Sequence, residues 1–224
     1  MDIAIIFLCI LLVPCILFTI INTVYNKYKD VDNKKKLSGF EVAREILDSH
    51  GLDKIYIVEV KSNLSDHYDS DHKVLRLSSD VFHGESLTAA AVAARVANYA
   101  VQDNEGYTLM KFRSFLNKII TFVNYAAYIL FIVGLALQDV SILEMTNYFI
   151  LLVLAFHLVT LPVEFDVCKR AKKDLDKNDI LTKKEMEEVD NVFKVSPYTF
   201  IMSMITCVST LVSEFMYNIQ RRGL

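Results

Sequence analysis

Residues 119–137 read IITFVNYAAYILFIVGLAL and residues 145–163 read MTNYFILLVLAFHLVTLPV, and neither stretch contains a Lys, Arg, Asp or Glu. A helix rises about 1.5 Å per residue, so that roughly 20 apolar residues cross the hydrocarbon core of a bilayer. Residues 3–24 form another uncharged block of this kind. The sequence therefore predicts an N-terminal transmembrane anchor at 1–24 and a transmembrane helical hairpin at 119–163.

The C-terminal segment 195–224 contains a fourth apolar block, at 195–213, which also holds a proline and several Ser and Thr side chains. Small hydroxyl residues are common where membrane helices pack together. Two alternatives stay open: a fourth transmembrane helix, or a helix that lies against the others. We expect a mainly α membrane protein with three to four transmembrane helices, whose first partner is the lipid bilayer.

Composition excludes several other classes of protein. Of the 224 residues 53% are hydrophobic, which is too many for a disordered chain. The net charge of −3 gives no overall basic field, so no nucleic-acid partner is predicted. Four cysteines are too few for a disulfide scaffold, and six glycines without a phosphate-loop pattern argue against a nucleotide site.

Lysine and arginine residues predict the orientation in the membrane. They are numerous after the first block and after the third, whereas the short link 138–144 has neither. Positively charged loops usually face the cytoplasm. We therefore expect 25–118 and 164–194 to be cytoplasmic and 138–144 to lie outside.

The region 25–118 has the pattern of a small α+β domain. Ser38 and Glu41 form a capping box before a predicted helix at 39–49, and Gly51 follows as a stop signal. Apolar runs at 55–60 and 73–78 predict two strands, which the turn-rich stretch 61–72 separates.

Two further helical segments follow from composition. Seven alanines between 86 and 102 predict a helix there, because alanine has the highest helix propensity. Residues 164–194 begin as a continuation of the third membrane helix and end in a charged helical segment. Its charges at 183–188 predict a face in contact with water.

Five separated segments resemble one family. They are LSDHYD at 64–69, VLRLSSDVFHG at 74–84, AVAA at 91–94, AVQDNEGY at 100–107 and LPVEFD at 161–166. Together they resemble the YugP-type family of bacterial membrane zinc metallopeptidases, in order and at nearly the same spacing. The resemblance implies location in the bacterial cell membrane, a zincin-like fold for 25–118 with its active-site helix at 86–102, and zinc as the family's cofactor.

The chain departs from this family at the catalytic motif. The family's H-E-x-x-H falls on Arg95-Val96-Ala97-Asn98-Tyr99. In the motif the two histidines hold zinc and the glutamate activates the metal-bound water. An arginine stays protonated and has no lone pair for a metal, and a valine cannot move a proton. We therefore expect no bound zinc, no functional catalytic residue at Arg95, Val96 or Tyr99, and no proteolysis.

Two carboxylates of the family site are still present. Asp103 matches a residue that orients the second histidine, and Glu164 is the candidate for the third zinc ligand, contributed from 164–194. One hypothesis is that the Arg95 guanidinium takes the place of the metal and pairs with Glu164 or Asp103. The plainer interpretations are that Arg95 lies on a helix surface and that Glu164 ends a membrane block at the interface.

His67 and His83 are possible groove residues. They could ligate metal in a rearranged site, but histidines in such loops more often brace them by hydrogen bonds.

Three functions stay open. The first is a membrane-anchored pseudoenzyme that binds a membrane or juxtamembrane protein, possibly an active family member. The second is an active membrane zinc metallopeptidase with a non-standard site that uses His67, His83, Asp103 and Glu164. The third is a scaffold whose substrate groove is filled.

Overall fold

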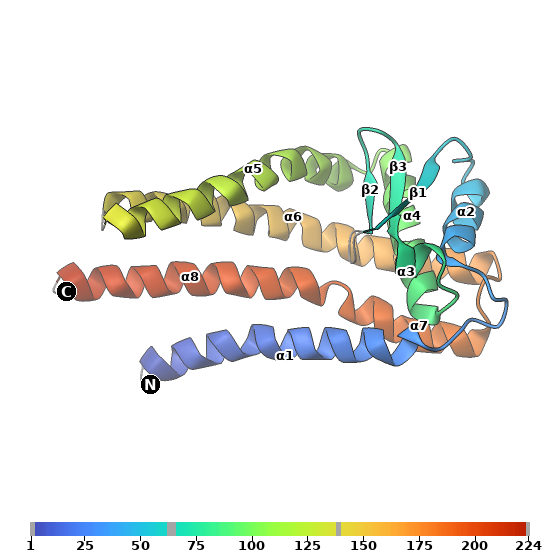
Figure 1. The fold of residues 1–224 in the computed structure, drawn as a ribbon, viewed down its shortest axis with the longest axis horizontal. Helices are drawn as coiled ribbons and strands as arrows, with labels where there is room; N and C mark the ends of the chain where they lie inside the picture. The colour runs from blue at the N-terminus through green and yellow to red at the C-terminus, as the bar shows by residue number, and fades with distance from the viewer. Residues whose placement is uncertain (1–2, 62–65, 138–139, 223–224) are drawn as a thin grey trace. The chain divides into compact units, whose positions relative to one another are not determined.

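The structure is a computed structural model that describes residues 3–61, 66–137 and 140–222. Within these ranges it describes the backbone but not the side chains of residues 3–11, 131, 135, 140, 143–144 and 213–222. Two compact units make up the chain: Met1–Thr19, Phe112–Pro162 and Tyr198–Leu224 in unit 1, and Ile20–Lys111 and Val163–Pro197 in unit 2. The elements in chain order (Figure 1) are α1 (Ile3–Lys29), α2 (Gly39–Ser49), β1 (Tyr56–Val60), β2 (His67–Asp69), β3 (Val74–Ser78), α3 (Ser79–Phe82), α4 (Leu87–Asn104), α5 (Thr108–Leu137), α6 (Val140–Lys177), α7 (Lys183–Val195) and α8 (Tyr198–Arg222).

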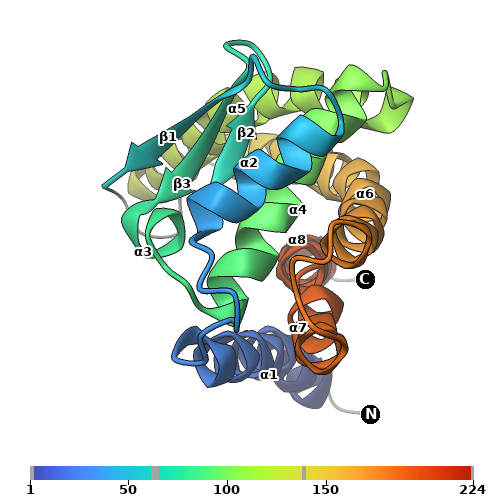
Figure 2. The same ribbon diagram turned by 90° about the vertical axis from the view of Figure 1, so that its right-hand side faces the viewer.

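Unit 2 contains a three-stranded sheet in the order β1-β3-β2. The outer strand β1 runs parallel to β3, with Tyr56 opposite Val74, and β2 runs antiparallel to β3, with His67 opposite Arg76. Helix α2 packs against α4, and both helices contact the sheet (Figure 2). Their shared core is aliphatic and alanine-rich, and includes Val42, Ile46, Leu47, Leu75, Leu77, Ala93, Val96 and Ala97.

Local sequence signals account for several elements of unit 2. The predicted capping box is present, because Ser38 and Glu41 bond reciprocally at the start of α2. The helix ends where Gly51 takes a left-handed backbone with φ +71°, as the stop signal predicts. The predicted helix at 86–102 is α4, which the Ser86 hydroxyl caps.

One strand was not predicted. The stretch 61–72, expected to be a turn, contains β2, and its first two motif residues, Leu64 and Ser65, lie outside the described residues. Three residues are too short for an alternating pattern to show. Pairing with β3 supplies the hydrogen bonds that hold β2 extended. Lys73, expected in the second strand, has φ 53° and belongs to the turn before it.

The charged segment at 183–188 is not a solvated face throughout, which corrects the expectation. Glu185 and Met186 are buried in α7. Glu185 caps the helix by accepting the Thr182 amide at 2.8 Å, and it also accepts the Lys34 amide at 2.7 Å. Met186 begins an apolar helical face that continues with Val189. The charges therefore occupy one side of an amphipathic helix whose other side joins the core.

Unit 1 contains most of the long apolar helices. Thr108–Gly134, Met145–Lys177 and Lys183–Val212 are each long and apolar enough to cross a membrane, by length and composition among the described residues. The third of these covers residues 195–212 of the apolar block for which the sequence left two alternatives open. Helix α1 forms over the predicted anchor, whose insertion in the membrane stays a prediction.

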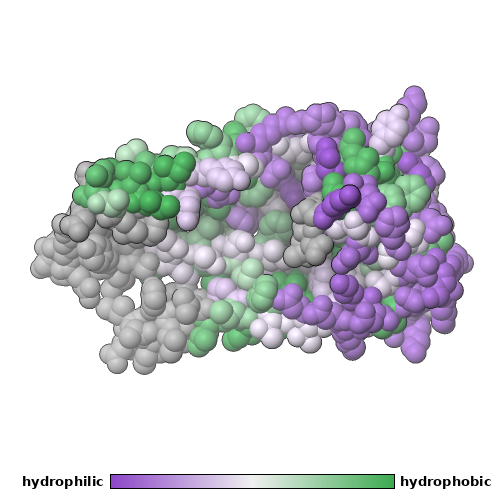
Figure 3. All heavy atoms as spheres, in the orientation of Figure 1, coloured by the Kyte–Doolittle hydropathy of each residue, from purple (hydrophilic) through white to green (hydrophobic). Residues whose placement is uncertain are grey.

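Within unit 1, α5 packs on α6. Ile120 and Val123 are buried against Phe156. Much of the remaining surface of α5 is apolar and exposed, as the green atoms over this helix in Figure 3 show.

Candidate functional site

Arg95 and Tyr99 both contact one buried carboxylate. They lie four residues apart on α4, which places them on the same face of the helix. Glu164, from α6, is 0% exposed. The Tyr99 hydroxyl donates to Glu164 Oε1, and Arg95 Nη1 lies 3.3 Å from Glu164 Oε2. Both oxygens of the carboxylate are therefore engaged by side chains from α4.

Arg95 is held as a cation in this place. Its side chain is only 17% exposed. Burial alone would lower the pKa of the guanidinium, but the neighbouring Tyr99, Tyr25 and Glu164 side chains outweigh burial and keep the pKa above its ordinary range. A buried carboxylate is costly unless a cation or hydrogen-bond donors compensate for it, and here it has both.

The residues at this position do not fit a zinc ion. A catalytic zinc site needs three protein ligands that offer lone pairs. Arg95 offers none, and Tyr99 donates its proton to Glu164. Val96 is fully buried in the aliphatic core. In the part of the chain that the structure describes, no three His, Cys, Asp or Glu side chains are grouped as metal ligands would be.

Asp103 has partners different from those of Glu164. It accepts the Tyr68 hydroxyl at 2.9 Å and Lys73 Nζ at 2.5 Å. Burial of Tyr68, followed by its hydrogen bond to Asp103, raises the pKa of that phenol well above its usual range. Asp103 thus connects the end of α4 to β2 and to the turn before β3, and the pairing partner of Arg95 is Glu164.

The two candidate histidines are not brought to Glu164. His83 is exposed, and its Nε2 lies 3.3 Å from Glu59 Oε2. His67 is exposed on β2. The structure therefore does not gather His67, His83, Asp103 and Glu164 into one ligand set.

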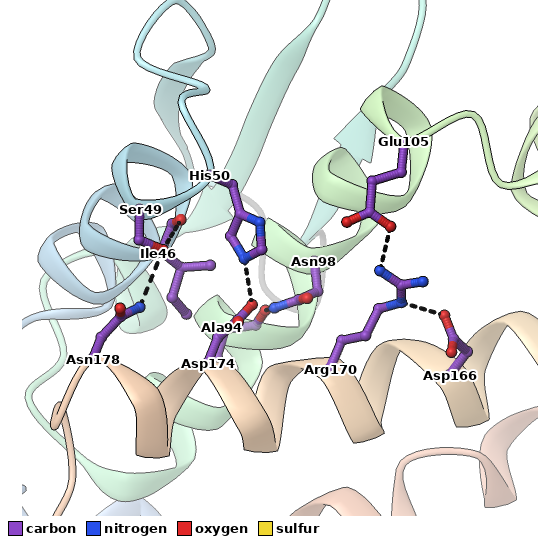
Figure 4. A network of polar contacts seen from close by, with 10 residues as sticks. All are labelled: Ile46, Ser49, His50, Ala94, Asn98, Glu105, Asp166, Arg170, Asp174 and Asn178. Atoms are coloured by element: carbon purple, nitrogen blue, oxygen red, sulfur yellow. Dashed lines mark hydrogen bonds and ion pairs between the residues drawn. The ribbon is translucent and has the colours of Figure 1, made fainter.

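Sequence reasoning missed a polar network between α6 and the helices α2 and α4 (Figure 4). Arg170 bridges two carboxylates: its Nε lies 2.5 Å from Asp166 Oδ2, and its Nη1 lies 2.5 Å from Glu105 Oε2. His50 Nε2, at the end of α2, lies 3.1 Å from Asp174 Oδ2. Only the four-residue spacing of Asp166 and Arg170 was visible in the sequence, because the other partners come from distant segments.

This network lines a cavity of about 730 Å³. Asn98 belongs to its wall and is 0% exposed. The Asn98 amide donates to the Ala94 carbonyl at 3.0 Å, while Asn98 Oδ1 has no hydrogen-bond partner among the described residues. Lys169 and Lys173 also line the cavity.

Comparisons with known proteins agree with the resemblance seen in the sequence. A family described as "Putative neutral zinc metallopeptidase" matches residues 3–218. The chain is 29% identical over 198 residues to the "Putative membrane protease YugP" of Bacillus subtilis (strain 168). The aligned region covers 88% of each of the two chains. No solved structure matches this chain. Because the match extends over almost the whole sequence, the chain belongs to the putative neutral zinc metallopeptidase family.

Proposed function

We propose that this chain is a membrane-anchored family member that holds no catalytic zinc, cleaves no peptide bond, and acts by binding a membrane or juxtamembrane protein. The contact of Arg95 and Tyr99 with the two oxygens of Glu164 carries this proposal. The resemblance assigns zinc ligands to these same three positions. Here a fixed guanidinium charge and a phenolic hydrogen bond neutralise the carboxylate in place of a metal.

The loss of proteolysis follows from the same helix. A zinc peptidase needs a general base that takes a proton from the metal-bound water. Val96 stands at that position and contributes only to the core. The zincin-like character of 25–118 is kept in this proposal as a scaffold, without the groups that carry out the chemistry.

The cavity beside α4 supports a binding role over a filled scaffold. Its volume of about 730 Å³ is in the range of ligand pockets. The lysines of 25–118 and 164–194 favour a cytoplasmic position for this cavity, so we expect the partner on that side of the membrane.

Zinc content tests the first half of the proposal. The full chain, purified in detergent without chelators, should hold well below one zinc per chain by elemental analysis. The double variant Arg95→His, Tyr99→His should gain close to one zinc, because it places two imidazole ligands opposite Glu164 and leaves Val96 in the core. The same double variant with Glu164→Gln is the matched control and should lose that zinc again.

Near-stoichiometric zinc in the wild-type chain that survives dialysis would contradict the proposal. It would favour the alternative, an active zinc metallopeptidase with a non-standard site. Zinc-dependent cleavage that is lost in His67 and His83 variants would then establish that alternative.

A further inference from the structure

The exposed surface of α5 includes two distinct faces. Phe115, Phe122 and Ile129 are exposed by 59%, 73% and 60% and form an apolar face. A second exposed face carries a polar stripe, which consists of Asn117, Thr121, Asn124 and Tyr128. With about 3.6 residues per turn, the spacing of four, three and four residues aligns the stripe along one side of the helix, roughly a third of a turn from the apolar face.

The stripe extends deep into the predicted span. At about 1.5 Å per residue, Asn124 lies about 8 Å and Tyr128 about 14 Å along the helix from Ile119, where the uncharged block begins. In a hydrocarbon core about 30 Å thick, Tyr128 is then close to the middle. The apolar face suits lipid at this depth, and the polar stripe does not.

Hydrocarbon cannot satisfy the polar groups of the stripe that lie inside the span, whereas Asn117, two residues before Ile119, lies at the edge of the span. The Thr121 hydroxyl donates to the Asn117 carbonyl of its own helix at 3.2 Å. The side chains of Asn117, Asn124 and Tyr128 make no hydrogen bond within the described part of the chain. A polar group left unpaired in hydrocarbon is costly, so that a helix with such a face is expected to place it against another polar surface.

We infer that the polar stripe of α5 pairs with the same stripe on a second copy of this chain. An amide and a phenol each donate and accept hydrogen bonds, so that the stripe is complementary to itself. None of its four residues carries a charge, so that two copies do not repel each other along it. Its alternating spacing of three and four residues is that of helices that cross at about 20° with interlocking side chains.

The inference requires α5 to span the membrane and does not depend on the loss of zinc. The zinc measurement and the test below can therefore fail independently of each other.

Disulfide cross-linking of the full chain in native membranes tests the pairing. Asn124→Cys should form a cross-linked dimer under a mild oxidant, because facing stripe positions bring Cα atoms within disulfide reach. Phe122→Cys, two residues away on the apolar face, is the matched control and should stay monomeric. The wild-type chain measures the background from its four native cysteines.

A dilution series in detergent supplies a second readout. Asn124→Leu should weaken dimerisation about 3- to 20-fold, the range of one hydrogen bond between membrane helices. Asn124→Gln should retain most of the dimer, and Phe122→Leu should leave it unchanged. Equal cross-linking at 122 and 124 would overturn the inference. So would an Asn124→Cys variant that does not cross-link but reacts with a membrane-impermeant thiol reagent, since the stripe would then line a water-filled space.

Discussion

The two carboxylates near α4 are paired in similar ways but in different surroundings. Glu164 is fully buried, and the side chain of its partner Arg95 is 17% exposed. The Asp103 side chain is only 11% exposed, but the side chain of its partner Lys73 is 57% exposed. Water can replace the Lys73 ammonium and cannot easily replace the Arg95 guanidinium. The exposure of the cation therefore decides how much stabilisation a carboxylate loses when the ion pair is broken.

Removal of the cation should show the largest difference between the two pairs. Arg95→Met should lower the free energy of unfolding by about 3–5 kcal/mol, because it leaves the Glu164 charge buried without its cation. Lys73→Met should cost about 0–1 kcal/mol, as is usual when one partner is exposed. Unfolding in detergent, followed by circular dichroism, measures both values.

A rescue separates charge from packing in the first of these variants. The double variant Arg95→Met, Glu164→Gln should recover most of the lost stability, because no uncompensated charge is left. If Arg95→Met and Lys73→Met destabilise equally, the two pairs are equivalent and the comparison fails.

The two tyrosines give a smaller contrast. Tyr99→Phe should cost about 2–3 kcal/mol, because the buried Glu164 loses a hydrogen bond that water cannot restore. Tyr68→Phe should cost about 1 kcal/mol, because Lys73 continues to bind Asp103. The same unfolding measurement reports both, and a larger effect for Tyr68→Phe would reverse the ranking of the two sites.

Low pH should lower the stability of the fold through Asp69, which lies on β2 next to Tyr68, the hydrogen-bond donor to Asp103. Burial alone would raise the pKa of Asp69, but hydrogen bonds from His72 and Arg76 outweigh it and lower the pKa to about 2. A carboxylate with a lowered pKa in the folded state stabilises the fold above its unfolded pKa of 3.8 and loses this contribution as the pH falls toward 2. The contribution should amount to about 1–2 kcal/mol.

The Asp69→Asn variant isolates this contribution. It should be less stable than the wild-type chain at pH 6, and the difference should shrink between about pH 4 and pH 2. A difference that is constant over this range would show that Asp69 acts through packing alone.

Local interactions are the part of this protein that its sequence determined. The uncharged blocks predicted the long helices, since about 20 apolar residues are what a span requires. Ser38, Glu41 and Gly51 fixed both ends of α2 through contacts within a few residues. Alanine content predicted α4, and the motif segments predicted the family that the comparisons show.

Tertiary structure decided what distant residues do to one another. Three-residue β2 exists because β3 pairs with it, and Glu185 is buried because the Lys34 amide reaches it across the fold. Arg95 could have been a surface residue or the partner of either carboxylate, as judged from its sequence alone. The choice of Glu164, 69 residues away, depends on where α6 passes α4. Sequence patterns record periodicity along one element, whereas the partner of a buried charge is set by packing between elements.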